Sequence, residues 1–300
     1  MSLLDTLVVT TLPLVPKSIV RRFAGPYIAG ESLNDAIEAV KKLNRQGIST
    51  TIDVLGESVT QPEKAQQYVS NYLKVLDAID QHDLDSNISI KPTQFGLGID
   101  TDLCRDNFIK LMDKLRKYDN FVRIDMEDSP FTTLTLDLHE SISAEYSKSG
   151  IVIQAYLRRT IKDLEERLIP GKANIRLCKG IYIEPHDLAY KDTDVVRKNF
   201  NLLLEKALKA GLYVGIATHD EILVWDAMRI IEKLDLSPDQ YEFQMLLGVT
   251  ESLRRQIVLE GHKMRVYVPF GKDWYAYSTR RLKENPKIAG YVFKDIFNLK

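Results

Sequence analysis

The sequence predicts an α/β protein built on a (β/α)8 TIM-type barrel with extra N-terminal helices. A short run rich in β-branched and aromatic residues alternates with a longer helical run, and the alternation recurs eight times. The eight units occupy about 240 residues, which is the usual size of such a barrel. No linker rich in Gly, Pro or Ser divides them. We therefore expect one domain, 1–300.

Its predicted parts are an N-terminal helical segment (1–47), the barrel (48–286) and a C-terminal tail (287–300). In the first part, Ala36, Ile37, Val40 and Leu43 give residues 35–46 helical spacing, and Gly47 ends the helix. The predicted strands are 48–55, 87–93, 121–127, 151–157, 174–181, 213–218, 242–247 and 264–268. The predicted barrel helices are 62–79, 102–118, 134–147, 160–168, 194–210, 221–234 and 251–260, with a last helix over 274–285.

An open doubly wound sheet is the competing architecture. That fold usually carries the pattern GxGxxG after its first strand, where a dinucleotide binds. Here the first strand continues as Leu55-Gly-Glu-Ser58, and the glycine pair Gly96-Leu-Gly98 follows the second strand without a third glycine. The closed barrel is therefore favoured.

Composition excludes several other classes of protein. A net charge of −1 argues against a nucleic-acid-binding protein. Cys104 and Cys178 are the only cysteines and lie far apart in the sequence, so we expect no disulfide framework. We therefore expect the protein to be located in the reducing cytoplasm. The apolar N-terminus contains Asp5 and two prolines, so we expect it to belong to the mature protein rather than to a transmembrane helix.

Polar side chains gather at the predicted C-terminal ends of the strands, where the active sites of such barrels lie. Alternate residues of a strand share a face, and here one face is polar: Ser89 and Lys91 alternate with Ile88 and Ile90. The apolar face must pack on the helices, so the polar face lines the interior, where ions are tolerated only when paired or bound. A buried ion pair explains any one of these residues, but a ring of them indicates a site for a charged ligand.

The last helix also carries groups that can grip a small anion. Arg280 and Arg281 follow Tyr277 by three and four residues, so all three can share one edge of the helix. Taken alone, they fit a solvated basic face better than a ligand site. The strand before this helix is expected to end at the break Pro269-Phe-Gly271.

His219 closes a predicted strand in Ala217-Thr-His-Asp220. No other histidine follows at a metal-ligand interval, so we expect a hydrogen-bonding or structural role and no metal.

The strand ends, taken together, resemble the proline dehydrogenase family in its short monofunctional form; a related domain occurs in the bifunctional proline utilisation enzymes. The matching pieces run in order over seven strands and the last helix: Ser89-Ile-Lys91, Ile124-Asp125 with Glu127, Gln154-Ala-Tyr156, Arg176-Leu-Cys-Lys-Gly180 with Tyr182, Ala217-Thr-His219, Tyr241-Glu-Phe-Gln-Met-Leu246, Arg265-Val-Tyr267 with Pro269 and Gly271, and Tyr277 with Arg280-Arg-Leu-Lys-Glu-Asn285. Ile181 and Ile183 depart from the expected pattern around Tyr182, as does Pro-Thr-Gln after Lys91.

The resemblance implies a barrel that holds non-covalent FAD across the strand ends. It assigns the substrate carboxylate to Lys91, Arg280 and Arg281, and the wall around the substrate ring to Tyr182, Tyr267, Tyr277 and Leu246 or Leu247. It implies that the flavin is surrounded by Asp125, Gln154, Arg176, Lys179, Gly180, Thr218, His219, Gln244 and Glu284. Lys91, Asp125, Tyr182, Arg280 and Arg281 are the implied catalytic residues.

The resemblance further implies hydride transfer from C5 of L-proline to flavin N5, giving Δ1-pyrroline-5-carboxylate, which pyrroline-5-carboxylate dehydrogenase would use after ring opening. Electrons would then pass to a membrane quinone. The apolar, lysine-bearing tail 288–300 is a possible peripheral membrane contact, although packing against the barrel fits it as well.

Two other functions stay open from the sequence. One is a Schiff-base lyase or aldolase on the same barrel, with Lys91 or Lys179 as nucleophile. The other is a catalytically inactive barrel used for binding or assembly.

Overall fold

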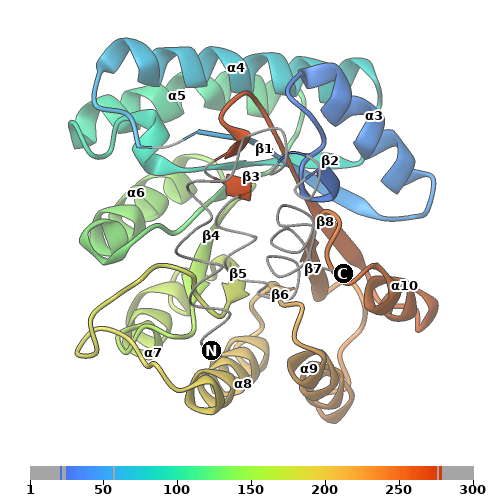
Figure 1. Cartoon of the computed structure of the whole chain (residues 1–300). Coiled ribbons are helices and arrows are strands. Elements are labelled where there is room, and N and C mark those ends of the chain that lie inside the picture. Colours follow the sequence, from blue (N-terminus) through green and yellow to red (C-terminus); the bar gives the residue numbers. More distant parts are fainter. Residues whose placement is uncertain (1–20, 22–24, 57, 276, 279–300) are drawn as a thin grey trace, which may run out of the picture.

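Eight parallel strands close a barrel in sequence order, and helices surround it (Figure 1). The computed structural model describes residue 21 and residues 25–56, 58–275 and 277–278. Strands β1 and β8 complete the closure through six paired positions, from Ser49 opposite Arg265 to Val54 opposite Phe270. The predicted (β/α)8 fold is therefore confirmed.

The element bounds follow the predicted alternation. The strands are β1 (Ser49–Val54), β2 (Ser86–Ile90), β3 (Val122–Ile124), β4 (Ser149–Gln154), β5 (Asn174–Cys178), β6 (Val214–Ala217), β7 (Tyr241–Leu246) and β8 (Met264–Phe270). The α-helices are α3 (Leu33–Asn44), α4 (Pro62–Gln81), α5 (Thr101–Lys117), α6 (Thr132–Glu145), α7 (Thr160–Asp163), α8 (Thr193–Lys209), α9 (Glu221–Lys233) and α10 (Glu251–Leu259). Short 3₁₀ turns are η2 (Gly25–Tyr27), η3 (Pro92–Phe95) and η4 (Ser129–Phe131).

The two faces of each strand separate as the alternation predicts. Apolar residues such as Ile52, Ile88 and Ile124 are fully buried in the layer between the barrel and the helices. Polar residues of the other parity bond to one another inside the barrel, as Thr51 of β1 does with its neighbour Asn87 of β2 at 2.5 Å. The hydrophobic core is thus a ring outside the sheet, and the interior is left to polar groups.

Capping side chains and a proline determine where several helices begin. Ser32 and Asp35 form a reciprocal capping box at α3, and Asp100 caps α5 through Leu103 N. Pro62 occupies the first turn of α4, where its missing N–H removes no helical hydrogen bond.

The predicted end of the last strand is wrong, because β8 runs through Pro269 to Phe270. Pro269 pairs in register with Asp53, and its carbonyl accepts a hydrogen bond from Ala29 N at 2.9 Å. In a strand, the N–H and C=O of one residue point to the same side. The edge of Pro269 that lacks an N–H therefore faces Ala29 rather than β1, and the ladder loses nothing.

Several other predicted boundaries also differ. The predicted strands 87–93, 151–157 and 174–181 end three residues earlier, at Ile90, Gln154 and Cys178. The predicted helix 160–168 begins as α7 but continues as a π-helical turn, η5 (Leu164–Leu168). The predicted strand 121–127 stops at Ile124, because Glu127 turns back to bond the loop after β2 through Thr93. The polar residues after Ile124 therefore stand on a loop at the barrel mouth.

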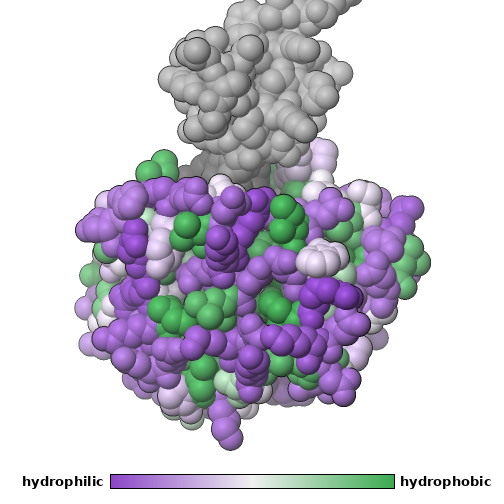
Figure 2. Space-filling view, turned by 90° about the horizontal axis from the view of Figure 1, so that it is seen from below, coloured by the Kyte–Doolittle hydropathy of each residue, from purple (hydrophilic) through white to green (hydrophobic). Residues whose placement is uncertain are grey.

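Single apolar side chains interrupt the largely polar outer surface over α7, α8 and α9 (Figure 2). The exposed ones there are Val195, Leu202, Ile222 and Trp225. Among the helices of the described residues, none has both the length and the apolar character needed to cross a membrane.

His139 is buried in the inner face of α6 at 3% exposure. Neither ring nitrogen has a hydrogen-bond partner among the described residues. Burial, with Arg123 nearby as a lesser cause, lowers the pKa of His139 from 6.5 to about 4.

This histidine should make folding stability fall with acidification. Between pH 6.5 and about 4 the unfolded chain binds a proton that the folded chain does not, so stability falls as pH falls through that window, by up to about 3 kcal/mol. Urea unfolding at several pH values should show a shallower dependence for His139→Leu than for the parent. His82→Gln, at an exposed position, is the control and should leave the dependence unchanged. If the stability of His139→Leu depended on pH as steeply as that of the parent, His139 would not be the group responsible.

Gly150 should be required by the packing of the barrel interior. A Cβ at this position would lie 2.4 Å from Arg123 Nη1 and 2.5 Å from the Asn174 carbonyl oxygen, which the same guanidinium contacts at 2.8 Å. We expect Gly150→Ala to lower the free energy of unfolding by about 1–3 kcal/mol, as overpacking does. Gly25→Ala, where a Cβ meets nothing within 4 Å, should change it little. Equal unfolding midpoints for the two variants would refute this account.

Candidate active site

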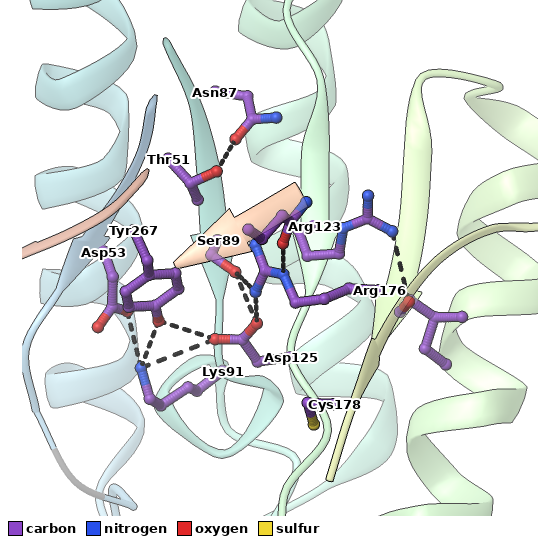
Figure 3. Close-up of polar contacts among 12 residues, drawn as sticks. Thr51, Asp53, Asn87, Ser89, Lys91, Arg123, Asp125, Arg176, Cys178 and Tyr267 are labelled. Atoms are coloured by element: carbon purple, nitrogen blue, oxygen red, sulfur yellow. Dashed lines mark hydrogen bonds and ion pairs between the residues drawn. The ribbon is translucent and has the colours of Figure 1, made fainter. Parts of the chain in front are cut away.

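A lysine and two aspartates from three strands meet at the mouth of the barrel (Figure 3). Lys91 follows β2, and its Nζ lies 2.7 Å from Asp53 Oδ1 of β1 and 3.9 Å from Asp125 Oδ2 after β3. Nζ also lies 3.4 Å from the hydroxyl of Tyr267 on β8. An ammonium has three N–H donors, and Asp53 and Tyr267 accept from two of them. Among the described residues, no acceptor is found for the third.

Asp125 organises the groups around it. Its Oδ1 accepts from Ser89 Oγ at 2.6 Å and from Arg176 Nη1 at 2.9 Å, and its Oδ2 accepts from the Tyr267 hydroxyl at 3.0 Å. Three donors from three strands thus converge on one carboxylate. Asp125 is therefore held in a fixed orientation and has little acceptor capacity left.

Arg176 connects this cluster to a deeper layer of the interior. Its Nε donates to Gln244 Oε1 at 2.5 Å, and Gln244 Nε2 donates to Glu242 at 2.6 Å. Glu242 in turn pairs with Arg265 at 2.7 Å. Polar residues at six strands therefore form one connected network, in which each charged member has a partner of opposite charge.

The charges of the cluster set its protonation states. Burial disfavours the charged form of Lys91, but Asp53 and Asp125 outweigh it, so the pKa of Lys91 is raised and the ammonium persists at neutral pH. Burial, reinforced by Asp125 and Asp53, raises the pKa of Tyr267 well above its usual value. Tyr267 is therefore a neutral phenol that donates to Asp125.

Glu127 and Gln154 fasten the neighbouring loops. Glu127 accepts from Thr93 N at 2.8 Å and from Thr93 Oγ1 at 2.5 Å, while Gln154 Nε2 donates to the Glu127 carbonyl at 2.9 Å. Burial raises the pKa of Glu127, although the bonds from Thr93 act against this. The ends of β2, β3 and β4 are thereby tied together beside Lys91.

A second cationic cluster stands at the ends of β5 and β6. Lys179 and Arg197 both pair with Asp220, at 3.0 and 2.9 Å. Burial opposes the anion of Asp220, but these two cations lower its pKa. Thr218 Oγ1 accepts from Asp220 N at 3.1 Å and fixes the turn. Two cations therefore share one carboxylate at an accessible rim.

His219 accepts a backbone hydrogen bond at the mouth, and Gly180 adopts a backbone conformation that only glycine fits. Leu246 N donates to His219 Nε2 at 2.8 Å, which links the ends of β6 and β7 and places the hydrogen of a neutral imidazole on Nδ1. This is the hydrogen-bonding role expected for His219. Gly180 has φ +108, and a Cβ there would lie 1.9 Å from the ring of Tyr156, so only glycine fits.

The other predicted site residues divide into two groups. Tyr182 is half-buried on the loop after β5, Tyr277 is buried, and Leu246 and Leu247 are half-buried at the end of β7. Arg280, Arg281 and Glu284 lie outside the described residues. No group of three or more His, Cys, Asp or Glu side chains in the described part of the chain could hold a metal ion.

Sequence reasoning missed three residues of the site, Arg197, Tyr72 and Asp220. Tyr72 on α4 lies at apolar helical spacing with Val69 and Leu76, so it is indistinguishable from a core residue until its hydroxyl is located. Asp220 directly follows His219 at a strand end, and that position is the signal that could have identified it.

Comparisons with known proteins agree with one another. The family model described as proline dehydrogenase matches residues 36–293. The proline dehydrogenase of Deinococcus radiodurans is 37% identical over 271 residues, which cover 89% of this chain and 87% of that one. Proline dehydrogenase 1 of Bacillus subtilis (strain 168) is 36% identical over 270 residues, covering 90% and 89%.

A solved structure shares the fold over almost the whole chain. Proline utilization A from Bdellovibrio bacteriovorus, crystallised after inactivation by N-propargylglycine, matches with a TM-score of 0.85 and 25% sequence identity. The match covers 93% of this chain and 36% of that one, so this chain corresponds to about a third of that larger protein.

Proposed function

The chain belongs to the proline dehydrogenase family, and from this premise we propose that it is an FAD-dependent L-proline dehydrogenase that forms Δ1-pyrroline-5-carboxylate. The observation that carries the proposal is the ammonium of Lys91, fixed at the barrel mouth by Asp53 and Tyr267 with one N–H left for a ligand. A carboxylate is the complementary ligand.

The donors at the mouth fit FAD. Arg176 and Lys179 supply positive charge for its phosphates or ring oxygens, and Thr218 and Gln154 supply neutral polar groups. Gly180 lets the backbone approach a ligand where any side chain would strike Tyr156. We assign non-covalent FAD binding to Asp125, Gln154, Arg176, Lys179, Gly180, Thr218, His219, Gln244 and Glu284.

Lys91 anchors the substrate carboxylate together with Arg280 and Arg281. Tyr267, Tyr277, Tyr182 and Leu246 or Leu247 enclose the ring of proline. Anchoring at the carboxylate turns binding into orientation, because the far carbon of a five-membered ring is then fixed relative to the strand ends.

FAD held by these residues would supply, at its N5, the acceptor for the hydride from C5 of proline, and would carry the electrons onward to a membrane quinone. The protein's part is to bind, orient and exclude water. The substrate amine must be neutral when the hydride leaves. Asp125 is poorly suited to take that proton, because Ser89, Arg176 and Tyr267 already occupy its oxygens. The product opens on hydration to glutamate semialdehyde, the substrate expected for pyrroline-5-carboxylate dehydrogenase.

A Schiff-base mechanism through Lys91 is disfavoured. The nucleophile of that mechanism is the neutral amine. Burial alone would lower the pKa of Lys91, but Asp53 and Asp125 outweigh it and raise the pKa, so the amine stays protonated. Lys91 therefore serves better as a permanent positive charge than as a nucleophile.

Flavin binding is the first prediction of this proposal. The purified protein should be yellow, and its colour should bleach when L-proline is added without oxygen. D-proline, whose carboxylate projects on the other side of the ring, is the control and should bleach it far more slowly. A colourless protein that takes up no FAD on reconstitution would refute the assignment.

The second prediction concerns the residues that anchor the substrate carboxylate. We expect Lys91→Met and Arg281→Met each to lower kcat/KM for proline by about 100-fold or more, because a charged hydrogen bond to the substrate is lost. Both variants should retain FAD, as absorbance of the purified protein will report. Lys114→Met, which removes a comparable 2.7 Å ion pair with Asp77 on the outer helices, should leave kcat/KM unchanged. Wild-type kinetics in Arg281→Met with flavin retained would exclude its role.

A further inference from the structure

The hydroxyl of Tyr72 occupies a position in the β1–β2 ladder that a direct backbone hydrogen bond would normally fill. The two strands pair from Thr50 opposite Ser86 to Ile52 opposite Ile88, and Thr50 N donates to Asp85 O at 3.0 Å. Continued by the same step of two residues, this register would bring Val54 N to Ser89 O. Instead Val54 N donates to the Tyr72 hydroxyl at 3.2 Å, and that hydroxyl donates to Ser89 O at 2.7 Å.

The inserted hydroxyl comes from outside the barrel. Tyr72 is on α4, is fully buried and packs against Phe95. Burial, with Asp53 nearby as the next cause, raises the pKa of Tyr72 well above its usual value, so it remains a neutral donor. An oxygen inserted between an N–H and a C=O must hold the two strands farther apart than a direct bond would. The pairing of β1 with β2 accordingly stops at Ile52.

The separated strands are those that carry the anchor for the substrate. Asp53 immediately precedes Val54, and Lys91 lies two residues after Ser89. The Tyr72 hydroxyl lies 3.3 Å from Asp53 Oδ1, the same oxygen that accepts from Lys91 Nζ at 2.7 Å. Asp53 is wholly buried, and its other oxygen has no hydrogen-bond partner among the described residues. The position of this carboxylate therefore depends on the contacts of Oδ1.

We propose that Tyr72 and Asp53 are positioning residues for the reaction: the Tyr72 hydroxyl separates β1 from β2, and Asp53 then holds Lys91 so that its third N–H faces the substrate carboxylate. This inference rests on the proposed function only for the identity of the substrate. The contacts of Tyr72 and Asp53 with the strands and with Lys91 do not depend on which ligand binds. Neither residue touches substrate; both act through Lys91.

Tyr72→Phe tests the inserted hydroxyl, since it removes one oxygen and keeps the ring packed against Phe95. Proline KM should rise about tenfold, while kcat should change less than about threefold, because Lys91 binds substrate and transition state alike. In a Lys91→Met background the same change should alter KM by less than about twofold, since the group through which it acts is gone. Tyr118→Phe, which removes a 2.7 Å bond to Asp77 outside the site, is the matched control and should change neither constant.

A second measurement does not depend on turnover. The rate at which acetic anhydride modifies Lys91, mapped by mass spectrometry of the holoenzyme against pH, reports the neutral amine. Removal of the Asp53 charge in Asp53→Asn should move the midpoint for Lys91 to lower pH, with the midpoint of Lys114 unchanged as an internal reference.

The outcomes separate the two proposals. If the wild-type protein does not oxidise proline, the proposed function fails, and the midpoint for Lys91 still decides whether Asp53 controls it. An unchanged midpoint in Asp53→Asn would overturn the role of Asp53. An effect of Tyr72→Phe on KM that is equal in both backgrounds, or absent from both, would overturn the role of Tyr72.

Discussion

The ion pairing of Lys91 with Asp53 and Asp125 is the constraint on which the rest of the mouth depends. A lone charge at this depth would be severely disfavoured, and each partner here is fixed by further contacts. Asp125 is held by Ser89, Arg176 and Tyr267, which come from three different strands. The cluster is therefore possible only in a closed barrel that brings β1, β2, β3, β5 and β8 around one axis (Figure 3).

This arrangement explains why the interior is polar although the core is apolar. The apolar ring between sheet and helices stabilises the fold, so the inward residues are free to be ionic. Bulk is limited inside, and Gly150 and Gly215 are placed where Arg123 and Gln244 need room. Gln244 in turn accepts from Arg176, which donates to Asp125 at the mouth, so the deeper layer helps to orient the upper one.

Much of this architecture could be predicted from the sequence, because its signals are local. Alternation along β2, with Ser89 and Lys91 set against Ile88 and Ile90, identified the inward face, and helical spacing of apolar residues located the helices. The partners within the interior were not predictable, since they depend on strand register, which a pattern of period two does not specify between strands. Tyr72 could not be identified either, because its ring behaves as core and only its hydroxyl is part of the site.

Charge balance explains why the proposed anchor needs groups beyond those at the described mouth. Lys91, Arg176 and Arg265 are each paired there with one carboxylate, of Asp53, Asp125 and Glu242, so these three ion pairs together are neutral. A substrate carboxylate adds one negative charge to this balanced set, and a buried anion requires an additional cation. Arg280 and Arg281, which lie beyond the described residues, are the cations that the proposed function assigns to that purpose. In the proposed function, one N–H of Lys91 would give direction to the contact, and the two arginines would supply the positive charge that the three neutral ion pairs do not.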